Sequence, residues 1–158
     1  GYWNDPAKTA ERFKPIQARQ PGLVMEEIAV WSGDTVRMDE EGYLYFISRR
    51  DEMIKTSGYR VSPTEVEEVV YGTDLVGECA AFGDAHPQLG QTIVVLVSAK
   101  AGSEPDTAAI LAHCKKQLPS FMVPHHVEVR SASLPRNPNG KIDRKLLAGE
   151  LANLFEQV

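Results

Sequence analysis

The chain has 158 residues, of which 42% are hydrophobic and 25% are charged, as is ordinary for a globular protein of one domain or of a small domain with an appendage. Its formal net charge of -5, with lysines and arginines scattered singly or in pairs, argues against a surface for nucleic acid or for an anionic membrane. The longest strongly apolar run, Ile93 to Val97, is far shorter than the roughly 20 residues that span a bilayer.

The N-terminal stretch predicts a short helix. Asn4, Asp5 and Pro6 are typical of a helix start, and the helix is expected to run through Phe13. The same stretch has charges and a proline where a secretion signal needs apolar residues. We therefore expect a cytoplasmic protein.

A β-rich stretch follows a turn expected at Pro21-Gly22. Residues 25–31 have a strand-like pattern, and residues 35–38 and 43–47 predict the two strands of a hairpin around the turn DEEG. This part of the chain has too few apolar residues for a core of its own. We expect it to pack on a larger body.

Four consecutive charged residues, Arg49 to Glu52, interrupt the apolar pattern and predict a domain boundary. A short strand is expected at residues 53–56. Ser62, followed by Pro63 and by Glu65, is typical of a capping box and predicts the start of a helix. Three valines, at positions 66, 69 and 70, would form the buried face of this helix.

The rest of the chain predicts a central sheet covered by helices. Residues 77–83 and 91–100 are expected to be neighbouring strands, and the run IVVLV in the second predicts burial on both faces. A helix should begin at Pro105-Asp106 and end at Pro119, followed by a strand at residues 127–130. The last helix is expected to begin at Asp143 and to bury Leu147, Leu151, Leu154 and Phe155. The fold class predicted is α+β, preceded by a β-rich arm.

The cysteines and histidines do not indicate a metal site. Cys79 and Cys114 have apolar neighbours at the spacing of a strand or helix, and we expect both in the core. The four histidines show no ligand spacing with them.

Two clusters in the first part of the chain could bind a nucleotide. Asp34 follows a glycine in SGD, where a carboxylate could accept hydrogen bonds from a vicinal diol such as ribose, but a plain turn aspartate is an alternative. Arg49 in SRRDE could contact phosphate or ribose oxygens, and Asp51 could sit at a hinge. A solvated charge run is the alternative for this second cluster.

Two further clusters lie in the second part. Gly58 in SGYR would let a ligand approach the backbone, and Arg60 could reach a phosphate. Lys141 ends the turn PNGK, where an ammonium group could neutralise a phosphate ester or could simply face water. The sequence contains no nucleophile, base and orienter triad and no glycine-rich phosphate loop.

Taken in order, these motifs resemble the carboxyl-terminal part of the AMP-forming adenylating enzymes, the superfamily of acyl-CoA synthetases, luciferases and nonribosomal peptide adenylation domains. The resemblance covers nearly the whole chain and is carried by GYWNDPAKTAERF, WSGD, DEEGYLYFISRRDEMIKTSGYRVSPTEVEEVV, PSFMVP and LPRNPNGKIDRKLL. It implies that residues 1–50 are the tail end of a large N-terminal domain. Residues 51–158 would be a mobile C-terminal lid that rotates between two half-reactions.

The resemblance also implies roles for single residues. Asp34 would hold the ribose hydroxyls, and Arg49 would contact ribose or phosphate. Arg60 would lie near phosphates of the nucleotide or coenzyme. Ser32 and Ser48 stand where the family usually has threonine and glycine, so close nucleotide contacts would differ slightly there.

Three more roles concern the movement of the lid. Asp51 matches the hinge, and Gly58 would line the pantetheine tunnel during thiol transfer. Lys141 matches the lysine that enters the site for adenylation and leaves it afterwards. A mobile loop would suit a group that is needed in one half-reaction only.

The implied function is that of an acyl-CoA ligase. Such an enzyme uses ATP to convert a carboxylic acid to an acyl-adenylate and then transfers the acyl group to coenzyme A. ATP and magnesium would bind mainly to the N-terminal domain, which the chain lacks and which would be its partner, so the chain alone is expected to be inactive. The alternatives are an adenylation domain that loads a carrier-protein phosphopantetheine and a stand-alone interaction module without catalysis.

Overall fold

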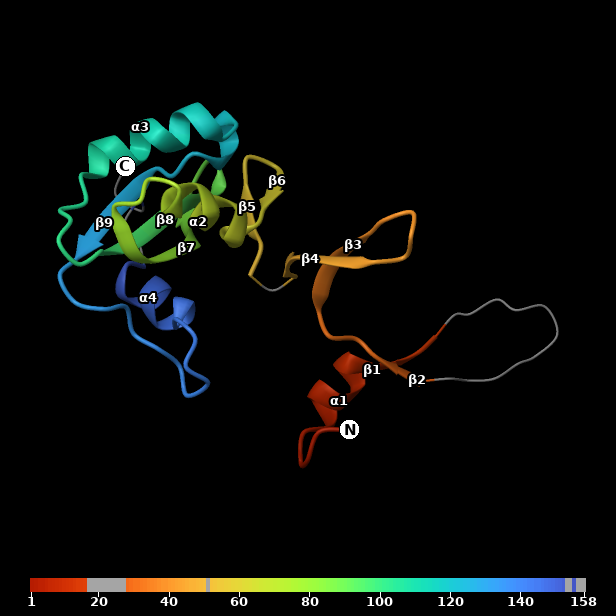
Figure 1. Cartoon of the computed structure of the whole chain (residues 1–158). Helices are drawn as coiled ribbons and strands as arrows, with labels where there is room; N and C mark the ends of the chain where they lie inside the picture. The colour runs from red at the N-terminus through yellow and green to blue at the C-terminus, as the bar shows by residue number, and fades with distance from the viewer. Residues whose placement is uncertain (17–27, 51, 153–154, 156–158) are drawn as a thin grey trace. The chain divides into compact units, whose positions relative to one another are not determined.

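The computed structural model describes residues 1–16, 28–50, 52–152 and 155 (Figure 1). The contacts divide the chain into two compact units, Gly1–Asp51 and Glu52–Val158. The turn expected at Pro21-Gly22 lies outside the described residues, as does the first part of the strand expected from Met25.

The first unit begins with helix α1 (Pro6–Arg12). The side chain of Asp5 caps this helix by accepting a hydrogen bond from the backbone N–H of Lys8 at 2.9 Å, which confirms the predicted start. Strand β1 (Phe13–Pro15) follows at once and pairs antiparallel with β2 (Ile28–Val30). The sequence did not predict β1, because a three-residue strand with a lysine and a proline has no apolar periodicity.

The predicted hairpin is confirmed as strands β3 (Asp34–Met38) and β4 (Leu44–Arg49), which pair antiparallel. Asp39 organises the turn between them, since its carboxylate accepts hydrogen bonds from the N–H groups of Glu41 and Tyr43 and from the Tyr45 hydroxyl. The cross-strand partners Val36 and Phe46, and Met38 and Leu44, place four apolar side chains on one face of the hairpin.

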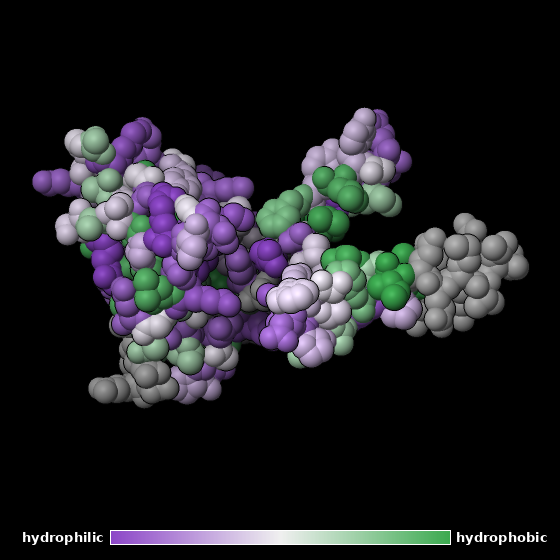
Figure 2. Space-filling model, turned by 90° about the horizontal axis from the view of Figure 1, so that it is seen from below, coloured by the Kyte–Doolittle hydropathy of each residue, from purple (hydrophilic) through white to green (hydrophobic). Residues whose placement is uncertain are grey.

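No described residue of the first unit is buried. The four apolar side chains of the hairpin face are all among the exposed large hydrophobic residues, and Phe46 is 59% exposed. Figure 2 shows such hydrophobic side chains on the molecular surface. As expected from its composition, this unit has no core of its own among the described residues.

The second unit is built on a five-stranded sheet. The long strands β7 (Val76–His86) and β8 (Gly90–Ala99) pair antiparallel along their whole length, as predicted. The other edge of β8 pairs in parallel with β9 (His126–Arg130). At its start, β8 pairs antiparallel with β5 (Ile54–Thr56), which forms an antiparallel hairpin with β6 (Tyr59–Val61). Strand β6 was not predicted.

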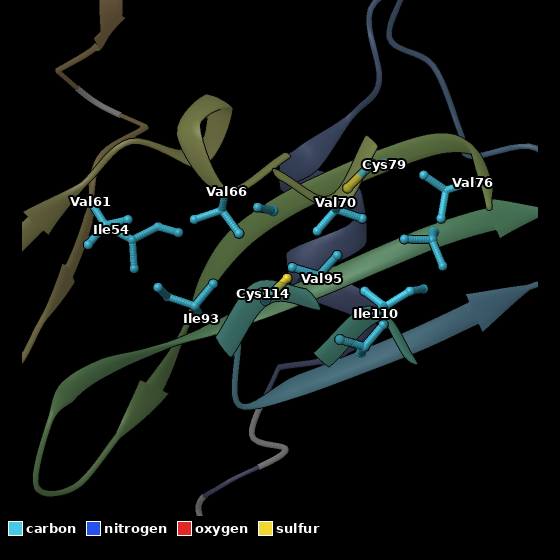
Figure 3. Close-up of a cluster of buried hydrophobic side chains, with 13 residues drawn as sticks. Ile54, Val61, Val66, Val70, Val76, Cys79, Ile93, Val95, Ile110 and Cys114 are labelled. Carbon is cyan, nitrogen blue, oxygen red and sulfur yellow. The ribbon is translucent and has the colours of Figure 1, made fainter. Parts of the chain in front are cut away.

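Helices cover both faces of this sheet. Ile93, Val95 and Val97 of β8 pack into one core, with α2 (Pro63–Tyr71) and α3 (Thr107–Gln117) (Figure 3). The alternate residues Val94 and Leu96 pack into a second core with α4 (Arg144–Glu150). The prediction that the IVVLV run is covered on both faces, and with it the α+β class, is confirmed.

Aspartates begin two of the three α-helices described in the second unit. Asp106 accepts a hydrogen bond from the N–H of Ala108 at the start of α3, and Asp143 accepts one from Leu146 at the start of α4. Ser62 occupies the N-cap position of α2 as predicted, but its side chain does not make the capping hydrogen bond that a capping box requires. Leu154, predicted in the buried face of the last helix, lies outside the described residues. No helix among the described residues is long and apolar enough to cross a membrane.

Candidate functional site

The turn Trp31-Ser32-Gly33-Asp34 connects β2 to β3 and is held by Arg12 from the end of α1. The Arg12 guanidinium donates hydrogen bonds to the carbonyl oxygens of Ser32, at 2.5 Å, and Trp31, at 3.3 Å. Gly33 has a φ of +86°, and a Cβ at this position would overlap with the same guanidinium. The backbone conformation therefore favours glycine here, and a side chain would also displace the Arg12 guanidinium.

Asp34 and Arg49 are brought together at the open end of the β3–β4 hairpin. They are cross-strand partners, and the Nε atom of Arg49 lies 4.0 Å from the Oδ1 atom of Asp34. Arg49 also donates a hydrogen bond to the Ser32 carbonyl at 3.4 Å. A pair this long on a partly exposed surface is weak, so the carboxylate keeps lone pairs that a ligand hydroxyl can use.

Asp34 lines an open hollow of about 480 Å³ in the first unit. Its walls come from residues 30–36 and from Arg50, whose backbone N–H donates to the Gly33 carbonyl at 2.8 Å. The exposed residue Trp31 contributes an aromatic wall to the hollow that Asp34 and Arg50 also line. The hollow thus combines an aromatic surface, a cation and a hydrogen-bond acceptor.

The turn between β5 and β6 consists of Ser57 and Gly58. Their φ angles are +50° and +82°, the pattern of a type I′ turn, which suits the twist of a two-residue hairpin. No atom lies within 4 Å of the position that a Cβ of Gly58 would occupy. A ligand could therefore approach the backbone of this exposed turn closely.

Arg60 follows this turn and is paired across the hairpin with Lys55. Both side chains are exposed, and like charges directly opposite each other on a hairpin repel. Next to them, the ring of Tyr59 stacks on Phe121 with centroids 4.0 Å apart. The result is a cationic hairpin whose turn is supported by an aromatic contact.

Lys141 lies in a tight turn between β9 and α4 and is exposed. The Asn137 carboxamide accepts hydrogen bonds from the backbone N–H groups of Asn139, at 3.0 Å, and Lys141, at 3.1 Å. The backbone N–H of Asn137 donates in turn to the Lys141 carbonyl at 2.8 Å, and Gly140 has a φ of +77°. Within the part of the chain that the structure describes, the Lys141 ammonium makes no ion pair.

Arginines on either side of this turn pair with carboxylates of the second unit. Arg136 contacts Glu78 of β7, and Arg144 contacts Glu67 of α2. The hydrogen bond from the Leu134 N–H lowers the pKa of Glu78, and Arg136 lowers it further. Burial raises the pKa of Glu67, against the opposing effects of the Ala81 N–H and of Arg144.

The described residues bring some predicted site residues together and leave others apart. Asp34 and Arg49 are neighbours in the first unit, while Gly58 and Arg60 share the β5–β6 hairpin of the second. Lys141 lies on a separate turn, and Asp51 falls outside the described residues. Among the described ranges, no group of three or more His, Cys, Asp or Glu could hold a metal ion.

Sequence reasoning missed the residues that support the site. Arg12, Glu67, Glu78, Arg136 and Arg144 were not singled out, although two of them flank Lys141 in RNPNGKIDR. Their partners lie far away in the chain, 58 residues for Arg136 and Glu78 and 77 residues for Arg144 and Glu67. No local pattern identifies such pairs, because they depend on how the elements pack.

Known proteins are similar to this chain in sequence. Residues 65–141, from α2 to the Lys141 turn, match the family described as AMP-binding enzyme C-terminal domain. A long-chain-fatty-acid–CoA ligase of Bacillus subtilis is 33% identical over 95% of the chain, which covers 24% of that protein. Tyrocidine synthase 3 of Brevibacillus parabrevis is also 33% identical, over 93% of the chain and 2% of its own length.

The fold comparison agrees. The crystal structure of ATP-bound MatB from Rhodopseudomonas palustris superposes with a TM-score of 0.82 at 27% identity, over 98% of this chain and 28% of that one. The chain therefore spans about a quarter of the length of the Bacillus subtilis ligase and of MatB.

Proposed function

This chain belongs to the AMP-forming adenylating enzymes as a C-terminal part, and from that premise we propose that the complete protein is an acyl-CoA ligase. It would activate a carboxylic acid with ATP to an acyl-adenylate and then transfer the acyl group to the thiol of coenzyme A. The observation that carries this proposal is the similarity of nearly the whole chain to a CoA ligase. In this proposal, ATP and magnesium bind mainly to a large N-terminal domain of the complete protein.

The first unit supplies nucleotide contacts in this proposal. Asp34 accepts hydrogen bonds from the ribose hydroxyls, and Arg49 contacts ribose or phosphate. The 4.0 Å separation from the Arg49 guanidinium leaves lone pairs on the Asp34 carboxylate, which supports its role as an acceptor. The exposed apolar face of the β3–β4 hairpin supports its assignment as the tail end of the large domain, against which that face would pack.

The second unit acts as the lid. Lys141 enters the site for adenylation and stabilises the negative oxygens of the carboxylate and the α-phosphate as they react. Its exposure, and the absence of an ion pair to any described residue, support this role. A rotation about Asp51 then replaces Lys141 with the β5–β6 hairpin.

The β5–β6 hairpin serves thiol transfer. Gly58 lines the pantetheine tunnel, and the open space around its Cα supports the passage of a thin chain past the backbone. Arg60 lies near phosphates of the nucleotide or coenzyme. The unfavourable juxtaposition of Arg60 with Lys55 supports this role, since an anionic group beside them would relieve the repulsion.

The acceptor is tested with the complete protein, ATP, a panel of carboxylic acids and either coenzyme A or a phosphopantetheinylated carrier protein. We expect AMP release and a thioester with coenzyme A. A thioester formed only on the carrier protein would favour the alternative that the similarity to tyrocidine synthase 3 suggests. If no acid in a broad panel led to AMP release, a non-catalytic interaction module would be favoured instead.

A further inference from the structure

Lys141 is flanked by two arginines that each bind a carboxylate on the body of the second unit. Before the turn, the Nη2 atom of Arg136 lies 2.5 Å from the Oε1 atom of Glu78 in β7. The other oxygen of Glu78 accepts a hydrogen bond from the Leu134 N–H at 2.6 Å. Arg136 also donates to the Gly140 carbonyl at 2.8 Å, so a single guanidinium connects the strand to the tip of the turn.

After the turn, Arg144 makes a second connection. Its Nη2 atom lies 2.9 and 2.8 Å from the two oxygens of Glu67 in α2, and its Nε atom donates to the first of them at 3.1 Å. Glu67 is only 7% exposed and accepts a further hydrogen bond from the Ala81 N–H of β7 at 2.7 Å. A buried carboxylate that holds an arginine with this geometry fixes the first residue of α4 to both α2 and the sheet.

Arg144 has a third contact. Its Nη1 atom lies 3.3 Å from the carboxylate of Glu52, the first residue of the second unit. The guanidinium is therefore shared between a carboxylate in the core and one at the boundary of the unit. Glu52, at the start of the unit, and Arg144, three positions after Lys141, therefore belong to one network of ion pairs.

We propose that Arg136 and Arg144 are positioning residues that clamp the Lys141 turn rigidly to the second unit. The turn is also closed by the Asn137 carboxamide, so its backbone is bonded on both arms and at its tip. The loop does not move by itself, and Lys141 is delivered or withdrawn only when the whole unit moves. The delivery and withdrawal of Lys141 rest on the proposed function, whereas the clamp does not.

The clamp is tested in the 158-residue chain by hydrogen exchange of the Asn139 and Lys141 backbone amides. Glu78→Gln keeps the shape of the side chain but removes its charge, and we expect these two amides to exchange at least about tenfold faster, as for the loss of a hydrogen bond to a charged group. Asp74→Asn is the matched control, because it removes the exposed pair with Lys100 elsewhere and asparagine tolerates the positive φ of position 74. It should leave both amides unchanged.

Two results would contradict the clamp. One is fast exchange of the Asn139 and Lys141 amides in the unaltered chain, and the other is an unchanged exchange rate of these amides in Glu78→Gln. The pair of Arg144 is tested with Arg144→Lys, which keeps the charge but cannot reproduce the bidentate contact. The melting temperature is recorded for each variant, so that a loss of the fold is recognised before exchange is compared.

A second arm uses the complete enzyme. In Arg136→Gln, kcat for adenylation should fall while KM for ATP and transfer from supplied acyl-adenylate stay close to the unaltered values, and Arg136→Lys should restore part of the loss. Equal losses in both half-reactions would contradict a positioning role. If Lys141→Ala itself left adenylation intact, the role proposed for Lys141 would fail, while the exchange experiment would still decide whether the clamp exists.

Discussion

Two carboxyl groups that hold the arginines beside Lys141 carry opposite pKa shifts. The Leu134 N–H and Arg136 lower the pKa of Glu78, whereas burial raises that of Glu67. The ionised form of Glu78 is thus stabilised by the fold, whereas burial makes the ionisation of Glu67 less favourable than in water. Each shift makes the free energy of unfolding depend on pH, with opposite sign.

A titration of the folded chain followed by NMR of the side-chain carboxyl groups should separate the two. Glu78 is expected to titrate below the ordinary value of 4.5 and Glu67 above it. Stability from Glu78 is present above pH 4.5 and is lost as the pH falls through its folded pKa. The contribution of Glu67 becomes less favourable as the pH rises from 4.5 through its folded pKa. Midpoints at 4.5 for both groups would contradict the described contacts.

The burial of both cysteines in the core was predicted from the sequence. Cys79 and Cys114 are both buried and unpaired, and burial raises the pKa of each thiol. We expect neither to react with a thiol reagent at neutral pH while the chain is folded, and both to react in denaturant. Ser131→Cys, at an exposed position, is the control that should react at once. Rapid reaction of a native cysteine would show that the core opens.

Among the elements, the β5–β6 turn depends most on backbone conformation. Gly58 has a φ of +82° with open space around its Cα, so Gly58→Ala should cost only the strain of the left-handed conformation, about 1–2 kcal/mol. Ser57 also has a positive φ, and Ser57→Asn creates the Asn-Gly pair that type I′ turns favour. Urea unfolding should show the first variant less stable and the second equally or more stable than the unaltered chain. The reverse order would contradict this turn type.

Elements were predictable where residues close together in the sequence determine them. The run from Ile93 to Val97 has no polar alternation, and it forms a strand buried on both faces. Strands β1 and β6 are three residues long and largely exposed, so their own sequence carries little signal. They form because a partner strand supplies hydrogen bonds, which a pattern of single residues does not reveal.

The site divides in the same way. Lys141, Gly58 and Asp34 stand in turns whose sequence is distinctive, and they were named from it. The arginine and glutamate partners behind Lys141 could not be named, because their contacts join elements that are distant in the chain. The structure shows the Lys141 turn bonded to itself and, through Arg136, to Glu78 of the second unit, while its mobility stays a prediction.

At the level of the whole chain, stability resides in the second unit. Every buried residue among those described belongs to residues 52–158, and none belongs to the first unit. A chain of residues 52–158 should therefore unfold cooperatively, with a melting temperature within about 4 °C of that of the full chain, a shift that corresponds to roughly 1 kcal/mol or less. Circular dichroism against temperature measures this. A shortened chain without a cooperative transition would show that the first unit contributes to folding.

The measurement that tests the central claim most directly is a comparison of the two half-reactions in the complete enzyme carrying Lys141→Ala. Pyrophosphate exchange reports adenylation, and thioester formation from supplied acyl-adenylate reports transfer. We expect adenylation to fall about 10²- to 10³-fold, the usual effect of removing one preorganised electrostatic contact, with transfer nearly unchanged. Lys145→Ala, at an exposed position in α4, serves as the control. Equal losses in both half-reactions, or no loss in either, would contradict the role proposed for Lys141.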